Sequence, residues 1–287
     1  MKNTFLISTS HLANGVWFKD DDDFRTGMNY VAVIAFQTGI SVLAFILMSN
    51  HVHFVVRCTR AEAEAFIIKY KTAFGKYLYN KYGVSDVLRR NTVDIRELPL
   101  EEESVERGIA YTQMNPVAAN ICASPELFAW GTGATFFKTI RSEGKQLSEL
   151  SLRKQQRLIH SNTQLPGHYR IGDDGFILPE SYVDVKLVER IFRTPKRYNY
   201  FLRSSSKARA RLEKTGEALP TFRDQSIIQA IPDLCISLFQ KRSIPELNRG
   251  ELGEIVRQIR YRFSADIKQI ARIFEKPYSE IAELAEG

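Results

Sequence analysis

Two histidines lie within a short apolar stretch, LMSNHVHFVV, at residues 47–56. Its β-branched and aromatic residues are typical of a strand that is covered on both faces. Because side chains alternate along a strand, His51 and His53 project from the same face, where two imidazoles can bind one cation in a fixed geometry. Taken alone, such a pair favours the other interpretation, two hydrogen-bonded and partly buried histidines. The remaining histidines show no such pattern.

A second group of chemically capable side chains lies in IAYTQMNPVAANI, residues 109–121. Tyr111 and Asn115 are four residues apart on an expected helix, so they share one face. A phenol oxygen can act as a covalent nucleophile, and an amide oxygen is a ligand suited to Mg²⁺ or Mn²⁺. A nearby cation would assist the phenol by polarising the phosphate that it attacks. We expect Asn115-Pro116 to end the helix. In the alternative interpretation this is the only role of the pair, and Tyr111 is a core residue.

The elements that position these residues can be predicted from periodicity and from the residues at helix ends. We expect strands over 3–9, 40–48, 51–58 and 91–98, and helices over 24–36, 59–83 and 101–114. Asn14-Gly15 marks a turn, Thr59 and Glu62 have the spacing of a capping box, and Gly83 ends that helix. The order β-α-β-β-α-β-α indicates an α+β fold of the split βαβ type, with helices on one face of an antiparallel sheet and the other face free for a site.

The character of the chain changes after about residue 136. Between residues 190 and 214 there are nine Lys or Arg and one acidic residue, with aromatic residues among them, in a chain of net charge +7. Such a stretch suits a nucleic-acid backbone, and equally a solvated helix face or a basic linker. Residues 223–287 have helical periodicity, and IKQIARIF, EKPY and SEIAEL suggest a helix-turn-helix. The second of these helices is acidic, so a packing or dimerisation module is a close alternative. We therefore divide the chain into 1–135, 136–222 and 223–287.

Four segments resemble the single-tyrosine HUH transposases, and in particular the REP-associated tyrosine transposases. They are MSNHVHFVV (48–56), KYKTAFGKYLYNKYG (69–83), YTQMNPVAAN (111–120) and FAW (128–130). H-x-H alone is unspecific, but these motifs in this order and spacing are specific, and the resemblance covers roughly residues 1–135. The chain departs from the family pattern at Asn120, where glycine is usual, and at Trp130-Gly131-Thr132, where Trp-Ser-Ser is usual.

The resemblance implies an RRM/ferredoxin-like HUH endonuclease core followed by a mostly helical C-terminal region. It implies that His51, His53 and Asn115 hold Mg²⁺ or Mn²⁺ and that Tyr111 is the nucleophile. The expected activity is DNA transposition or recombination by cleavage and rejoining of hairpin-containing single-stranded DNA, through a 5′-phosphotyrosine and a free 3′-OH. The expected DNA contacts are Lys69, Lys71, Lys76, Arg190, Arg193, Lys196, Arg197 and Arg203.

Other functions and competing nucleophiles stay open at this point. The chain could be a catalytically inactive RRM-like nucleic-acid-binding protein, or a metal phosphoesterase in which water attacks in place of Tyr111. Further tyrosines, Tyr70, Tyr77, Tyr79 and Tyr82, lie on the helix expected over 59–83. Three cysteines without metal-ligand spacing and no apolar run of about 18 residues favour a reduced, cytoplasmic protein without a membrane span. Monomer and homodimer both stay open.

Overall fold

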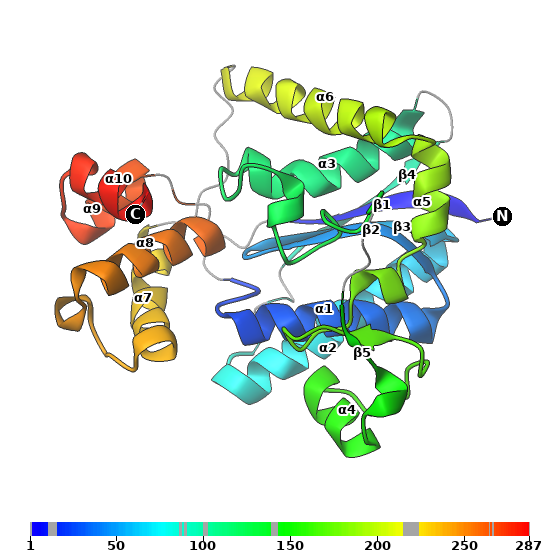
Figure 1. Cartoon of the computed structure of the whole chain (residues 1–287), viewed down its shortest axis with the longest axis horizontal. Coiled ribbons are helices and arrows are strands. Elements are labelled where there is room, and N and C mark those ends of the chain that lie inside the picture. The colour runs from blue at the N-terminus through cyan, green and yellow to red at the C-terminus, as the bar shows by residue number, and fades with distance from the viewer. Residues whose placement is uncertain are drawn as a thin grey trace.

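Four antiparallel strands form the sheet that organises the first part of the chain in the computed structural model (Figure 1). The structure describes residues 2–10, 16–85, 88, 91–99, 103–138, 143–214, 224–263, 265 and 267–286. The strands are β1 (Asn3–Thr9), β2 (Ser41–Met48), β3 (His51–Cys58) and β4 (Val93–Leu98), in the spatial order β2-β3-β1-β4. Helices α1 (Asp21–Thr38), α2 (Arg60–Tyr82) and α3 (Ser104–Ala118) alternate with them. The predicted order and the α+β class are confirmed.

The ends of α2 follow the predicted capping chemistry. The Thr59 hydroxyl accepts from the backbone N–H of Glu62, and the Glu62 carboxylate accepts from the backbone N–H of Thr59. Gly83 ends the helix at φ 67°, a left-handed conformation that glycine adopts without steric cost. The capping box and the glycine stop are therefore confirmed. The turn predicted at Asn14-Gly15 lies outside the described residues.

The prediction that Asn115-Pro116 ends the third helix is wrong, because α3 continues to Ala118 with Pro116 inside it. Proline has no N–H to give to the carbonyl four residues earlier, here that of Thr112. The Asn115 side chain supplies the missing donor, since its Nδ2 lies 3.3 Å from Thr112 O. The helix then ends through bonds such as that from Ile121 N to Pro116 O, and Asn120 takes the left-handed conformation at φ 55°.

Helices cover both faces of the sheet, so the prediction of one free face is wrong. Helices α1 and α2 lie on one side and α3 lies on the other, where it packs on β2 and β3 (Figure 1). The physical reason is the apolar side of α3, where Val105, Ile109 and Ala110 are buried. An uncovered face would have left these side chains and their partners on the sheet in water.

The segment after residue 136 packs against the same unit. It contains β5 (Lys145–Gln146), α4 (Leu152–Ile159), β6 (Arg170–Ile171), α5 (Val185–Phe192) and α6 (Pro195–Lys214). Phe192, Tyr198 and Phe201 from α5 and α6 belong to the same buried cluster as the sheet, and α6 packs along α3. A smaller cluster joins Val33 on α1 to residues such as Ile177. The division of the chain into three regions stays a prediction.

The last part of the chain is helical, as predicted. Helices α7 (Asp224–Phe239), α8 (Arg249–Phe263), α9 (Ile267–Phe274) and α10 (Tyr278–Glu286) share a buried cluster that includes Ile227, Ile259 and Ile281. The helices predicted for IKQIARIF and SEIAEL are present as α9 and α10, separated by a short turn. None of the helices in the described part of the chain has the length and apolar character needed to cross a bilayer. Cys58, Cys122 and Cys235 are free thiols.

Candidate active site on the sheet

The two histidines lie side by side on β3, on the face that α3 covers. Their exposed fractions are only 6% for His51 and 5% for His53, and their ring centroids are 4.9 Å apart with the rings nearly perpendicular. Their neighbour Phe54 points to the opposite face, where its ring meets those of Phe66 and Tyr70 on α2. The alternation along β3 thus places both imidazoles on one face, as the sequence predicts.

Hydrogen bonds hold both rings at the same ring atom. Nδ1 of His51 lies 2.6 Å from Oδ1 of Asn50, the residue directly before it. Nδ1 of His53 lies 2.9 Å from Oγ of Ser8, its antiparallel partner on β1. A cation bound by these two imidazoles would therefore be held through Nε2. A hydrogen bond at Nδ1 is the usual support for a metal-binding histidine, because it fixes the orientation of the ring.

Helix α3 brings Tyr111 to the histidines. The Tyr111 and His53 ring centroids are 5.5 Å apart in an edge-to-face arrangement. Tyr111 is 44% exposed although its helical neighbours Ala110 and Thr112 are buried. An exposed phenol beside two buried imidazoles is not the core residue of the alternative interpretation. The phenol ring and the two imidazoles therefore lie together on one face of the sheet.

Asn115 lies one helical turn after Tyr111 and is buried. Its Nδ2 donates to the carbonyl oxygens of Tyr111, at 2.8 Å, and Thr112, at 3.3 Å. Both bonds engage the amide nitrogen of Asn115 with the backbone of its own helix. The same bonds give Asn115 a structural role beside Pro116, so its role as a third ligand remains a prediction.

The side chains of the site can be compared with the ligands that a divalent cation prefers. Two imidazoles held at Nδ1, with an amide oxygen on the adjacent helix, suit Mg²⁺ or Mn²⁺ if the phosphate supplies the remaining oxygens. Within the described ranges, no group of three or more His, Cys, Asp or Glu side chains is arranged to hold a metal. A cation held by two imidazoles and one amide oxygen would leave positions for phosphate and water oxygens.

The predicted DNA contacts are divided between two faces of the molecule. Lys69, Lys71 and Lys76 lie on α2, across the sheet from Tyr111 (Figure 1), and the others lie on or next to α5 and α6. The Arg197 guanidinium pairs with Glu106 and Glu103, and these contacts raise its pKa. The charge of Arg197 is therefore largely balanced by carboxylates of the protein itself. The exposed residues at the second location are Arg190, Arg193, Lys196 and Arg203.

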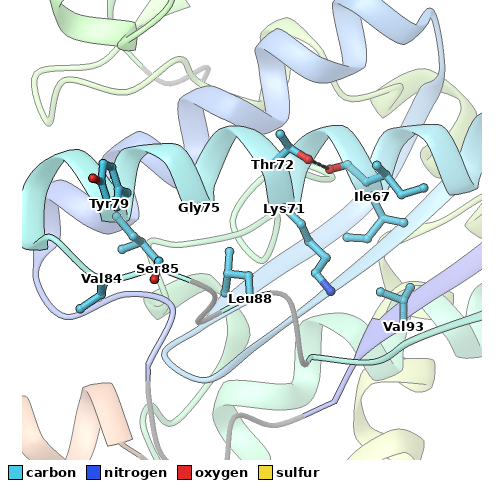
Figure 2. Close-up of a pocket in the computed structure, with 11 residues that line it drawn as sticks. Ile67, Lys71, Thr72, Gly75, Tyr79, Val84, Ser85, Leu88 and Val93 are labelled. Carbon is cyan, nitrogen blue, oxygen red and sulfur yellow. Dashed lines mark hydrogen bonds between the residues drawn. The ribbon is translucent and has the colours of Figure 1, made fainter.

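Lys71 lines a groove between α2 and the segment that leads to β4 (Figure 2). The groove has a volume of about 460 Å³, and apolar side chains such as Ile67, Leu88 and Val93 line most of it. The Lys71 ammonium donates to the Asn91 carbonyl oxygen, and burial lowers its pKa. The Lys71 side chain thus ties α2 to this segment on the far side of the sheet from the histidines.

The competing tyrosines of α2 are poorer nucleophile candidates than Tyr111. Tyr70 is fully buried and bonds to the Gly27 carbonyl, and burial raises its pKa well above the usual value. Burial, followed by the charge of Asp23, also raises the pKa values of Tyr77 and Tyr82. Of these four tyrosines, Tyr79 remains as a possible nucleophile, and its side chain is 58% exposed. It lines the groove on the far side of the sheet.

Some residues that support the site or hold α3 in place were not predicted from the sequence. Ser8 joins it through strand register, which the sequence does not specify. Gln113 on α3 is buried and donates to the backbone oxygen of Thr132, and it accepts from the Tyr198 hydroxyl on α6. Only Asn50 carried a usable signal, since it adjoins His51 between the strands expected over 40–48 and 51–58.

Comparisons with known proteins give one distant similarity. No protein-family model matches the chain, and no curated protein matches it. Among solved structures, the chain is similar to a REP-associated tyrosine transposase bound to a REP hairpin. The superposition covers 60% of this chain and 94% of that chain, with 8% sequence identity and a TM-score of 0.34. This likeness is distant at most.

Proposed function

We propose that this chain is a metal-dependent DNA strand transferase, acting on hairpin-containing single-stranded DNA with Tyr111 as its nucleophile. The observation that carries the proposal is the meeting of the Tyr111 ring with the paired imidazoles of His51 and His53. Residues more than fifty positions apart in the sequence, on a strand and a helix, form one cluster with the order and residue types of the resembled family.

The proposed reaction begins with attack of the Tyr111 phenol oxygen on a DNA phosphorus atom. A bond from Tyr111 Oη to phosphorus forms, and the bond from phosphorus to the 3′-oxygen breaks. The phenol proton passes to water, which reaches the exposed side chain, and the leaving 3′-oxygen takes up a proton. The products are a 5′-phosphotyrosine and a free 3′-OH. A second 3′-OH can then attack the phosphotyrosine, which restores Tyr111 and joins the strands without a nucleotide cofactor.

The surrounding residues would hold and orient this reaction. His51, His53 and Asn115 would hold Mg²⁺ or Mn²⁺, which when bound supplies charge stabilisation at a non-bridging phosphate oxygen. The strand β3 fixes the two imidazoles, and the packing of α3 on β2 and β3 fixes Tyr111 relative to them. Because the catalytic groups stand on packed elements rather than on loops, little reorganisation precedes attack.

The DNA strand would reach Tyr111 from the α3 side of the sheet. The exposed cations of α5 and α6 lie on that side, since α6 packs along α3. We assign backbone contact to Arg190, Arg193, Lys196 and Arg203 in preference to the lysines of α2. Tyr200 is an exposed aromatic residue on α6 on which a base could stack.

The proposal is tested with a pool of single-stranded hairpin oligonucleotides, incubated with Mn²⁺ or EDTA and analysed by denaturing gel and intact mass. We expect a Mn²⁺-dependent increase in protein mass equal to a DNA fragment. The adduct should be lost in Tyr111→Phe and in His51→Ala. It should persist in the control Tyr79→Phe, which removes a hydroxyl from a comparably exposed tyrosine on α2.

Three other outcomes would each replace the proposal. An adduct that persists in Tyr111→Phe would exclude this residue as the nucleophile. Cleavage without any adduct would favour a phosphoesterase in which water attacks. A mobility shift that survives EDTA, with neither cleavage nor adduct for any hairpin in the pool, would favour the inactive RRM-like nucleic-acid-binding protein.

A further inference from the structure

We propose that Asn50 is a positioning residue that fixes the tautomer of His51 and so selects the nitrogen offered to the metal. This inference rests on the proposed function, and it adds a role that the resemblance did not supply. Asn50 does not contact the reacting atoms in this scheme. It acts through the ring of His51, from the turn that joins β2 to β3.

The argument begins with the atom that faces the ring. Oδ1 of Asn50 lies 2.6 Å from Nδ1 of His51, a short hydrogen-bond distance. An amide oxygen can only accept a hydrogen bond, so Nδ1 of His51 must carry the proton. The neutral ring then keeps its lone pair at Nε2, and a lone pair is what a metal ligand needs. Asn50 therefore prepares His51 for binding through Nε2 before any cation arrives.

The hydrogen bond at His53 differs in kind from the one at His51, so a partner at Nδ1 does not always select a tautomer. Nδ1 of His53 lies 2.9 Å from Oγ of Ser8. A hydroxyl can donate or accept, so Ser8 orients the ring of His53 but is compatible with either tautomer. The contact of Nδ1 of His51 with the Asn50 amide oxygen, by contrast, is compatible with one tautomer. The two histidines should therefore respond differently when their partners are changed.

The turn that carries Asn50 is held firmly. The carbonyl oxygen of Ser49 accepts from the backbone N–H groups of Trp17, at 2.7 Å, and Phe18, at 3.3 Å. Asn50 itself is buried. A buried amide on a fixed turn holds its partner ring with little loss of entropy when a ligand binds, which is the condition for preorganisation. The turn thus places the Asn50 amide oxygen as the acceptor and holds it in a fixed position.

The first experiment measures the tautomer directly, without metal or DNA. Long-range ¹H–¹⁵N NMR of the metal-free protein at neutral pH distinguishes protonated Nδ1 from protonated Nε2 in each imidazole. We expect His51 as the Nδ1–H tautomer in the wild type and in Asn50→Asp, whose carboxylate also only accepts. We expect a mixture of tautomers in Asn50→Ala. Protonated Nε2 at His51 in the wild type would overturn the inference.

The second experiment measures Mn²⁺ affinity by electron paramagnetic resonance, again without DNA. Removing a partner of a metal-binding histidine costs about 10–100-fold in affinity, and we expect this loss in Asn50→Ala. Asn50→Asp should bind Mn²⁺ at least as tightly as the wild type, and the exposed control Asn80→Ala should match the wild type. A merely structural role would not be rescued by aspartate in this way.

The two measurements separate failure of the inference from failure of the proposed function. Equal Mn²⁺ affinity in wild type and Asn50→Ala would overturn the role of Asn50, even if covalent DNA adducts form. Absence of Mn²⁺ binding in the wild type, with His51 still the Nδ1–H tautomer, would instead overturn the metal-dependent function. Because Asn50→Asp keeps an acceptor at the turn, the inference is testable even if Asn50→Ala fails to fold.

Discussion

Substitution of Tyr198 by phenylalanine should destabilise the protein through a single buried hydrogen bond. The Tyr198 hydroxyl on α6 donates to Oε1 of Gln113 on α3. Nε2 of Gln113 is already engaged, at 3.1 Å from Thr132 O, so the amide cannot turn to find a new partner for Oε1. Both side chains are buried, and an unsatisfied buried acceptor costs about 1–3 kcal/mol. The expected loss is therefore a large part of a typical stability of about 5–15 kcal/mol.

The assay is urea unfolding followed by tryptophan fluorescence. The two tryptophans, Trp17 and Trp130, both belong to the buried cluster around the sheet, so the signal reports on the unit that contains Gln113. Tyr200→Phe is the matched control, since Tyr200 lies on the same helix and is 63% exposed. Substitutions at such surface positions change stability by at most about 0.5 kcal/mol.

The double variant Tyr198→Phe, Gln113→Leu completes the test. Replacing both partners by apolar groups removes the unsatisfied acceptor, so the double variant should be less destabilised than the sum of the single variants. An interaction energy of about 0.5–3 kcal/mol is expected for such a contact. If Tyr198→Phe unfolds at the same urea concentration as Tyr200→Phe, the hydrogen bond does not hold α6 to α3, and the reasoning is refuted.

Three further substitutions probe packing and charge in the unit that contains the sheet. Gly131→Ala would place a Cβ 2.7 Å from the backbone oxygen of Phe45, and we expect a loss of about 1–3 kcal/mol by urea unfolding. Gly75→Ala, where a Cβ meets nothing within 4 Å, should instead stabilise α2 by about 0.5–1 kcal/mol, and a loss there would contradict the packing described. Lys81→Met would remove the ammonium that lies 2.9 Å from the buried Asp23 carboxylate, at a cost of about 3 kcal/mol at neutral pH. Burial, more than any other cause, raises the pKa of Asp23. Asp23 therefore contributes to the stability of the fold at low pH, and this contribution is lost as the pH rises through the pKa of Asp23 in the folded protein. Urea unfolding should therefore show a smaller defect for Lys81→Met near pH 4 than at pH 7, and an equal defect at both would exclude Asp23 as the cause.

The parts of the fold that follow from local patterns were predictable from the sequence. Strand alternation placed His51 and His53 on one face, and capping residues fixed both ends of α2. The free sheet face was a wrong prediction because periodicity reveals the apolar side of α3 but not the surface on which it packs. The end of α3 was misplaced because the Asn115 side chain replaces the donor that Pro116 lacks. The rule that proline ends a helix failed here because a side chain supplied the missing hydrogen-bond donor.

Contacts between distant segments explain what the sequence could not supply. Tyr198 and Gln113 are 85 residues apart, and His53 and Ser8 are 45 apart, so neither pair leaves a local pattern. On α3 the side chains of three alternate residues have different tasks: Tyr111 meets the histidines, Gln113 binds Tyr198 and Thr132, and Asn115 binds the backbone of its own helix. Of the three side chains, that of Tyr111 is exposed and those of Gln113 and Asn115 are buried. The proposed attack on DNA needs an exposed phenol, whereas the contacts that hold α3 are made by its buried neighbours.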